Sequence, residues 1–193
     1  MVYRDTRLSS MQKWSASLGI DITNNSVFKH FLKTTRDTQL RWFQFRLLHR
    51  TLPCQRYLFL RKIVNTPVCN FCTQEEQTLE HLLWDCDKTQ EFWFDLLVWL
   101  HANFNHSSHF RFSKQLVILG HVPGVYTDKV IDLFILLAKY HIYYANLNHS
   151  APHLQVFIRL IKQRYKIERL NSCLEFKQVN FYREWGPYMH YFL

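Results

Sequence analysis

Three cysteines and one histidine lie close together near the middle of this 193-residue chain, in the pattern Cys69-x2-Cys72-x8-His81-x4-Cys86. Thiolate sulfur and imidazole nitrogen are common ligands of zinc, and structural zinc sites use four such ligands in a tetrahedron. The spacing therefore predicts one structural Zn2+ ion held by all four residues. Because no coordination position is left for water, hydrolytic zinc chemistry is disfavoured. The alternative is that three buried free thiols and a histidine are neighbours by chance.

The five-residue step from His81 to Cys86 constrains the backbone between them. Residues five apart on an ideal α-helix point about 140° away from each other, given 3.6 residues per turn. We therefore predict that a short helix starting near Thr78 carries His81 and that the chain unwinds near Asp85. Cys86 then reaches the ion before Asp87 caps the next helix. Four apolar residues are expected to anchor this knuckle to the core: Leu79, Leu82, Leu83 and Trp84.

The composition favours a globular, mainly helical chain. Hydrophobic residues make up 48% of the sequence and aromatic residues 17%, which is more core-forming material than a disordered segment carries. The 4 Gly and 5 Pro leave few positions for the tight turns of an all-β fold. No apolar run approaches the roughly 18–20 residues of a membrane span. Residues 1–10 do not resemble a secretory signal, so we expect an intracellular protein, nuclear and/or cytoplasmic, without a membrane partner.

Apolar periodicity and capping residues predict an irregular helical bundle, mainly α, with a small CCHC zinc knuckle inserted between its helices. Residues 1–66 form an N-terminal basic helical region, residues 67–102 the knuckle and the following helix, and residues 103–193 a C-terminal helical region. Residues 116–119 fit either a short strand or a turn of helix. In the N-terminal region, helices are predicted from Ser9 or Ser10 to Leu18, from Asn25 or Ser26 onward, from Thr38 to about His49, and from about Cys54 to Ile63. The second of these buries Val27, Phe28, Phe31 and Leu32, the third is capped by Asp37, and the fourth has Pro53 as an early residue. Further helices are predicted from Asp87 to His101, from Thr127 to about Asn146, from Pro152 onward, and from about Cys173 to Trp185.

Charge is segregated along the chain, which carries a formal net charge of +9. Residues 36–62 and 159–169 are strongly basic, whereas residues 69–100, which include the candidate zinc ligands, are acidic. The basic regions indicate a polyanionic partner, and attraction to phosphates gives affinity without sequence specificity. Because the acidic knuckle repels phosphates, we expect it to brace the basic helices and not to form the main RNA surface.

The candidate RNA contacts lie in the two basic regions. On the predicted helix that follows Asp37, the side chains of Trp42, Arg46 and Arg50 fall on one side. A base can stack on the indole there while the guanidinium groups hold phosphates. The competing interpretation is that the indole belongs to the core, as indoles at helical spacing more often do. The predicted RNA-binding residues are Arg41, Trp42, Arg46, Arg50, Arg56, Arg61, Lys62, Lys162, Arg164, Lys166 and Arg169.

Further residues surround the zinc motif in a recognisable order. They are Leu40-x2-Phe43-x3-Leu47-x-His49-Arg50-x-Leu52-Pro53, then Glu75-Glu-Gln-Thr-Leu-Glu-His81, then Trp84-x-Cys86 and Phe92-Trp93. Over residues 37–100 this order resembles the zinc-binding region after the polymerase in LINE-type non-LTR retrotransposon proteins, and the similarity is weaker at residues 116–120 and 134–140. The resemblance implies a segment that binds template RNA and assists target-primed reverse transcription, with endonuclease and polymerase upstream. Asn70-Phe71 stands where the family often has Pro-Leu, a difference that leaves the ligands untouched.

We do not expect this chain to be an enzyme by itself. The sequence contains no Asp-Asp pair, so the two-metal carboxylate motif of a polymerase palm is absent. The expected partners are RNA, with DNA as an alternative, and a reverse transcriptase body, and no small-molecule substrate is expected. Two other interpretations stay open. One is a zinc-stabilised protein-interaction scaffold that docks through its acidic patch, and the other is a truncated element copy without activity.

Overall fold

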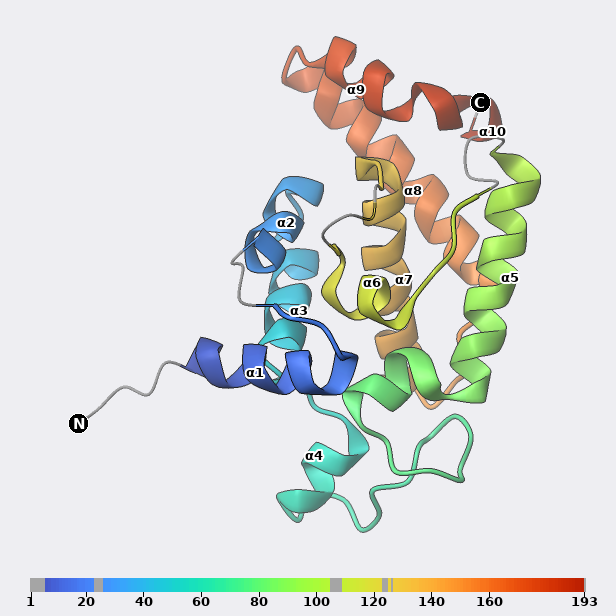
Figure 1. Cartoon of the computed structure of the whole chain (residues 1–193). Helices are drawn as coiled ribbons and strands as arrows, with labels where there is room; N and C mark the ends of the chain where they lie inside the picture. Colours follow the sequence, from blue (N-terminus) through green and yellow to red (C-terminus); the bar gives the residue numbers. More distant parts are fainter. Residues whose placement is uncertain (1–5, 23–25, 105–108, 123–124, 126, 193) are drawn as a thin grey trace.

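The computed structural model of the chain describes residues 6–22, 26–104, 109–122, 125 and 127–192 (Figure 1). The helical elements are α1 (Thr6–Leu18), α2 (Ser26–Thr34), α3 (Thr38–Leu48), α4 (Gln55–Leu60), the π-helical turn η1 (His81–Asp85), α5 (Asp87–Asn103), α6 (Lys114–Leu119), α7 (Lys129–Leu147), α8 (Leu154–Leu174), α9 (Gln178–Trp185), the 3-10 turn η3 (Gly186–Tyr188) and α10 (Met189–Phe192). Within the described ranges the chain has no β-strand, only an isolated bridge between Val68 and Glu76. The predicted mainly α bundle with a knuckle between helices is confirmed.

Helix α7 is the centre of the bundle. It contacts α2, α3, α6, α8, α9 and η1, and 15 of its 19 residues are buried. One continuous hydrophobic core extends from Trp14 on α1 to Tyr188 in η3. No helix among the described residues is long and apolar enough to cross a membrane.

Capping side chains fix where the two most informative helices begin. Asp37 accepts hydrogen bonds from the backbone N–H groups of Gln39 (2.9 Å) and Leu40 (3.1 Å), which confirms its predicted role at the start of α3. At α7 the prediction was wrong by one residue. Asp128 is the cap, while the hydroxyl of Thr127 donates to the Asp132 carboxylate at 2.5 Å.

Several predicted boundaries need correction. Helix α1 is already formed at Thr6, the first described residue, so neither Ser9 nor Ser10 caps it. Pro53 precedes α4, whose cap is Cys54. Asp87 is the first residue of α5 and not its cap, because the extended backbone of Cys86 takes the capping position. Leu32 on α2 is exposed where a buried position was expected, and the side chain of Phe28 lies outside the described residues.

The C-terminal helices divide at a different place from the prediction. Helix α8 continues through Cys173 to Leu174, and a turn with Phe176 in the left-handed region (φ 55°) leads to α9. The N–H of Lys177 donates to the carbonyl of Ser172 at 2.8 Å, which closes this turn. No Gly or Pro marks the position in the sequence. Residues 116–119, left open between strand and helix, belong to α6, which ends at Gly120 (φ 75°).

Buried polar groups on α7 interrupt its apolar surface. Lys139 is completely buried, and its Nζ donates to Oε1 of Gln44 on α3 at 2.6 Å. The amide nitrogen of Gln44 in turn donates to the carbonyls of Ile118 and Leu119, each at 3.2 Å, so α3, α6 and α7 meet at one polar junction. Burial lowers the pKa of Lys139 to about 7, because the interior disfavours the charged form.

We expect the stability of the fold to rise with pH because of Lys139. The unfolded lysine holds its proton up to about pH 10.4, whereas the folded one loses it near pH 7. Between these values the unfolded chain binds the extra proton, so the free energy of unfolding increases by up to about 1.4 kcal/mol per pH unit. Urea unfolding of the wild type and Lys139→Met at several pH values between 7 and 9 measures this contribution. Equal slopes of the free energy of unfolding against pH in the two proteins would contradict this contribution of Lys139.

Candidate metal centre

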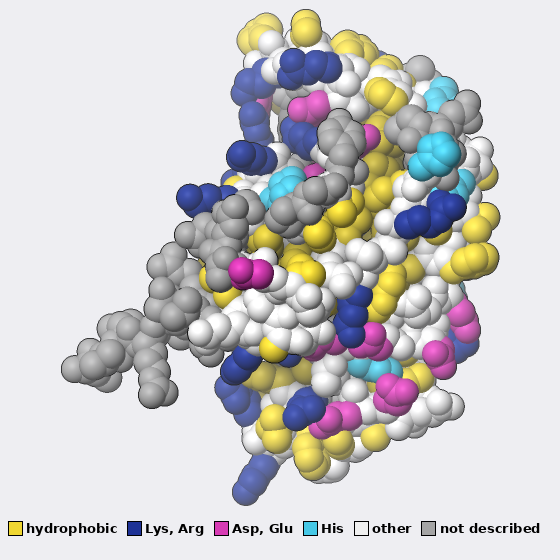
Figure 2. Space-filling model, in the orientation of Figure 1, with side chains coloured by type: hydrophobic (Ala, Val, Ile, Leu, Met, Phe, Trp, Pro, Cys, Tyr) yellow, Lys and Arg dark blue, Asp and Glu magenta, His cyan; other side chains and the backbone are white. Residues whose placement is uncertain are grey.

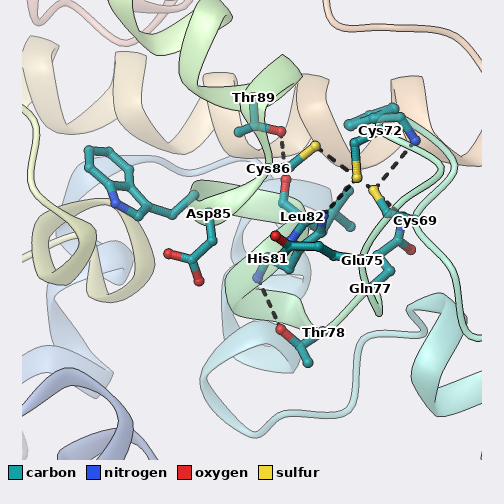
Figure 3. A network of polar contacts seen from close by, with 12 residues as sticks. Cys69, Cys72, Glu75, Gln77, Thr78, His81, Leu82, Asp85, Cys86 and Thr89 are labelled. Atoms are coloured by element: carbon teal, nitrogen blue, oxygen red, sulfur yellow. Dashed lines mark hydrogen bonds and ion pairs between the residues drawn. The ribbon is translucent and has the colours of Figure 1, made fainter.

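The four candidate ligands of the knuckle converge on one point (Figure 3). Their ligand atoms all lie within 4.8 Å of one another. The sulfurs of Cys69 and Cys86 are 3.9 Å apart, and the sulfur of Cys72 is 3.4 Å from Nε2 of His81. A tetrahedral Zn2+ with Zn–S bonds of about 2.3 Å and Zn–N bonds of about 2.0 Å puts two sulfurs about 3.8 Å apart and sulfur and nitrogen about 3.5 Å apart. The donor set and its dimensions therefore fit zinc.

A tight turn presents the first two ligands. The N–H of Cys69 donates to the carbonyl of Glu75 (2.8 Å), and the N–H of Thr73 returns to the carbonyl of Cys69 (2.9 Å). Thr73 adopts the left-handed conformation (φ 56°) that this reversal requires. The bridge between Val68 and Glu76 closes the base of the loop. Cys69 and Cys72 therefore face the same side despite a gap of only two residues.

The second pair of ligands is joined by a π-helical turn. The N–H of Cys86 donates to the carbonyl of His81 at 2.9 Å, a hydrogen bond between residues five apart. The helix that carries His81 ends at Asp85 and Cys86 is extended, close to the expected break, but η1 widens the helix up to that residue, which was not expected. A turn closed between residues i and i+5 brings them together on one side, as the regular α-helix does for i and i+4. Widening the helix thus places His81 and Cys86 on the same side, which a regular α-helix does not do.

Residues around the ligands orient them, and sequence reasoning missed these residues. The side-chain nitrogen of Gln77 and the N–H of Phe71 each lie 3.4 Å from the sulfur of Cys69 as donors. Gln77, fully buried, also donates to Asn146 at the end of α7 (2.9 Å). A Glu75 oxygen lies 3.1 Å from Nδ1 of His81, on the ring edge opposite the metal-facing Nε2. Partners of this kind hold ligands in place, but no sequence period marks them.

The surroundings of Cys69 favour its thiolate. The hydrogen bond between the sulfurs of Cys69 and Cys86, together with that from Gln77, lowers the pKa of Cys69 to about 4 against the opposing effect of burial. Thiolates are the form that binds zinc. Cys54 differs, because burial raises the pKa of its thiol and it lies outside the cluster. Cys54 is a core thiol as expected, whereas Cys173, also expected in the core, is exposed.

The family comparison agrees with this geometry. Residues 9–93 match the family model described as zinc-binding in reverse transcriptase. This segment, 85 of the 193 residues, is similar to that family. The match confirms the resemblance for the zinc-binding region, and it begins on α1, well upstream of the residues that suggested it. No curated protein shows significant similarity to the chain.

An arginine ties the first helix of the zinc-binding domain to the metal centre. Arg50 donates to Glu80, directly before the ligand His81, at 2.7 Å. Its guanidinium lies 4.1 Å from the ring centroid of Trp14 on α1. The indole N–H of Trp14 donates to the carbonyl of Leu48 at 2.9 Å. Arg50 therefore has a structural position inside the zinc-binding domain, with 27% of its side chain exposed.

The other predicted RNA-binding residues occupy two kinds of position. Arg41 donates to the carbonyls of Leu32 and Thr35, and Arg164 pairs with Asp37 with only 15% of its side chain exposed. Trp42 lies outside the core with 60% of its surface exposed. The remaining basic candidates are exposed or half-buried at the surface: Arg46, Arg56, Arg61, Lys62, Lys162, Lys166 and Arg169.

Among the cysteines of the zinc-binding domain, we expect only those of the cluster to be needed for zinc retention. Cys86→Ser removes one sulfur ligand, so the purified protein should lose most of its zinc. Cys54→Ser changes a buried thiol outside the cluster and is the matched control. Elemental analysis of natively purified protein gives the zinc content of each variant. Wild-type zinc content in Cys86→Ser would contradict the assignment of this ligand.

Proposed function

We propose that the chain is an RNA-binding module that works beside the reverse transcriptase of a LINE-type element and assists target-primed reverse transcription, without a catalytic centre of its own. The observation that carries this proposal is an aromatic strip at the surface of α3 and of its C-terminal cap His49, in the zinc-binding domain. The rings of Trp42 and Phe45 stack with centroids 5.4 Å apart, and those of Phe45 and His49 are 4.2 Å apart. Exposed rings of this kind are platforms on which unpaired bases stack.

Basic side chains accompany the strip. Arg46 lies on α3 between Trp42 and His49, with a hydrogen bond of 3.0 Å to the carbonyl of Thr51. Beyond α4, Arg61 lies over the ring of Tyr57 at 4.0 Å. Exposed cations beside stacking rings hold the phosphates of a single strand. This supports RNA as the ligand of the face formed by α3 and α4.

We propose that the metal centre is structural and takes one Zn2+. The knuckle supplies four protein ligands and thereby leaves no position for a reacting water. Zinc binding by such peptides is worth about 10–16 kcal/mol, similar to the whole stability of a domain. Through Gln77, Arg50 and Glu80 the centre is connected to α7, α3 and α1. Its role is to hold α3 in place.

The acidic charge of the knuckle supports a structural role for the metal centre and an RNA-binding role for the basic helices. Figure 2 shows acidic side chains gathered at the lower right, where Figure 1 draws the chain between α4 and α5. Within the knuckle, the side chains of Glu75, Glu76 and Asp85 are exposed. Repulsion keeps phosphates away from the metal centre. RNA is thereby directed to the basic helices.

Trp42→Ala should weaken the binding of single-stranded RNA by roughly 5- to 150-fold, since one stacked base contributes about 1–3 kcal/mol. Phe94→Ala is the matched control, because Phe94 is similarly exposed (66%) on the acidic helix α5. Fluorescence anisotropy with a labelled oligonucleotide at two salt concentrations measures both variants. Equal losses in both variants would argue against the strip as the binding platform.

Arg46→Ala and Arg50→Ala should have different effects. Arg46→Ala removes a surface cation and should weaken RNA binding while leaving the melting temperature nearly unchanged. Arg50→Ala leaves Glu80, which is buried, without its partner. It should lower the free energy of unfolding by about 2–3 kcal/mol, somewhat less than the ~3–5 kcal/mol of a fully buried pair. Urea titration alongside anisotropy separates the two, and a stable Arg50→Ala would contradict the structural role of Arg50.

A zinc-ordered protein-interaction scaffold is the second candidate, favoured by the same exposed acidic group on the knuckle. In that case the acids dock a basic surface of a reverse transcriptase body. The wild type would then bind RNA weakly or with no dependence on salt, in contrast to the steep salt dependence of phosphate contacts.

A further inference from the structure

A polar cleft of about 700 Å³ lies between the α2–α3 corner and the α8–α9 hairpin. It is away from the metal centre and is lined by residues far apart in the sequence, from Leu32 on α2 to Trp185 on α9. Figure 2 shows Lys and Arg side chains around this region, between the positions that α2 and α9 have in Figure 1.

The mouth of the cleft is basic. Lys33, Arg36, Lys129 and Lys177 line it and are all exposed. They come from α2, the α2–α3 corner, α7 and the turn before α9, so only the fold assembles them. None of the four was among the predicted RNA contacts. Cations converging on one opening are an electrostatic site for a polyanion.

Glu184 of α9, which also lines the cleft, pairs with Lys129 at 2.8 Å, and a second carboxylate occupies two more of these cations. Glu175, at the end of α8, accepts a hydrogen bond from Lys177 at 2.7 Å and one from Arg36 across the mouth. These two donors lower the pKa of Glu175 to about 2, so it is a carboxylate at neutral pH. Exposed ion pairs contribute little to stability, so this contact is easily exchanged. A phosphate group accepts hydrogen bonds from the same donors in the same manner.

The base of the cleft is held by a separate contact. Asp37 pairs with Arg164 of α8, and both side chains are less exposed than the pair at the mouth. Arg164 also lies 3.9 Å from Glu168, whose pKa is raised by burial. The walls therefore stay together when the contact at the mouth opens. The acids inside repel phosphates, so a nucleic-acid backbone stays at the rim.

We propose that the mouth of this cleft is a second RNA contact site, where phosphates of single-stranded RNA replace the carboxylate of Glu175 on Arg36 and Lys177. The proposal rests on the RNA-binding function proposed above. Single strands fit because polar groups of Asn171, Ser172 and Asn180 line the cleft and can meet unpaired base edges. In the free protein Glu175 acts as a competitor for the phosphate.

The decisive variant is Glu175→Gln, which removes the negative charge that competes with phosphate for the two cations. It should tighten the binding of single-stranded RNA by several-fold. Glu91→Gln is the matched control, because Glu91 is also exposed and paired with a lysine, Lys88, but on α5. The control removes the same charge and should change the affinity by less than about twofold, as distant exposed charges are screened.

The complementary variant Arg36→Ala/Lys177→Ala should weaken binding and lower the slope of log affinity against log salt by about 0.7 for each lost phosphate contact. Anisotropy over a salt series gives both quantities, and circular dichroism verifies the fold of each variant. RNA binding that requires Trp42 but is unchanged in all cleft variants would overturn the cleft site alone. If the wild type binds no RNA at low salt, the cleft site and the proposed function both fail.

Discussion

The structure depends on bringing a histidine and a cysteine five residues apart to the same side of one short segment. A regular α-helix separates them, so the hydrogen bond from Cys86 to His81 widens the helix into a π turn. This turn puts Leu82 and Leu83 into the core, and α5 starts at Asp87, directly after Cys86. The same few residues thus form the metal centre and join the knuckle to the bundle.

Polar contacts, not only apolar packing, connect this centre to the rest of the chain. Gln77 reaches from the sulfur of Cys69 to Asn146 on α7, and Glu80 reaches Arg50 at the end of α3. At the other end of α3, Asp37 caps the helix and pairs with Arg164 of α8. Helix α3 is therefore fixed at both ends, so the aromatic strip has a defined position between the knuckle and the cleft.

The helical class, the four converging ligands and the Asp37 cap were predictable because each depends on residue types at short spacing. The π turn was not, since the same sequence permits unwinding or widening, and only packing of Leu82 and Leu83 in the core selects one. Gln77 and Glu175 carry no periodic signal, and their partners are brought near by the fold. The left-handed turn at Phe176 was missed because neither Gly nor Pro announces it.

The contacts of Trp14 bear on how small an autonomous version of this domain can be. Its indole supplies the donor to the carbonyl of Leu48 and the face on which Arg50 rests. A truncated protein starting at Asp37 would keep every candidate metal ligand. It would expose the carbonyl of Leu48 and the guanidinium of Arg50, together with the apolar surface beneath α1. The shortest independently folding fragment must therefore include α1, although that helix supplies none of the four candidate ligands.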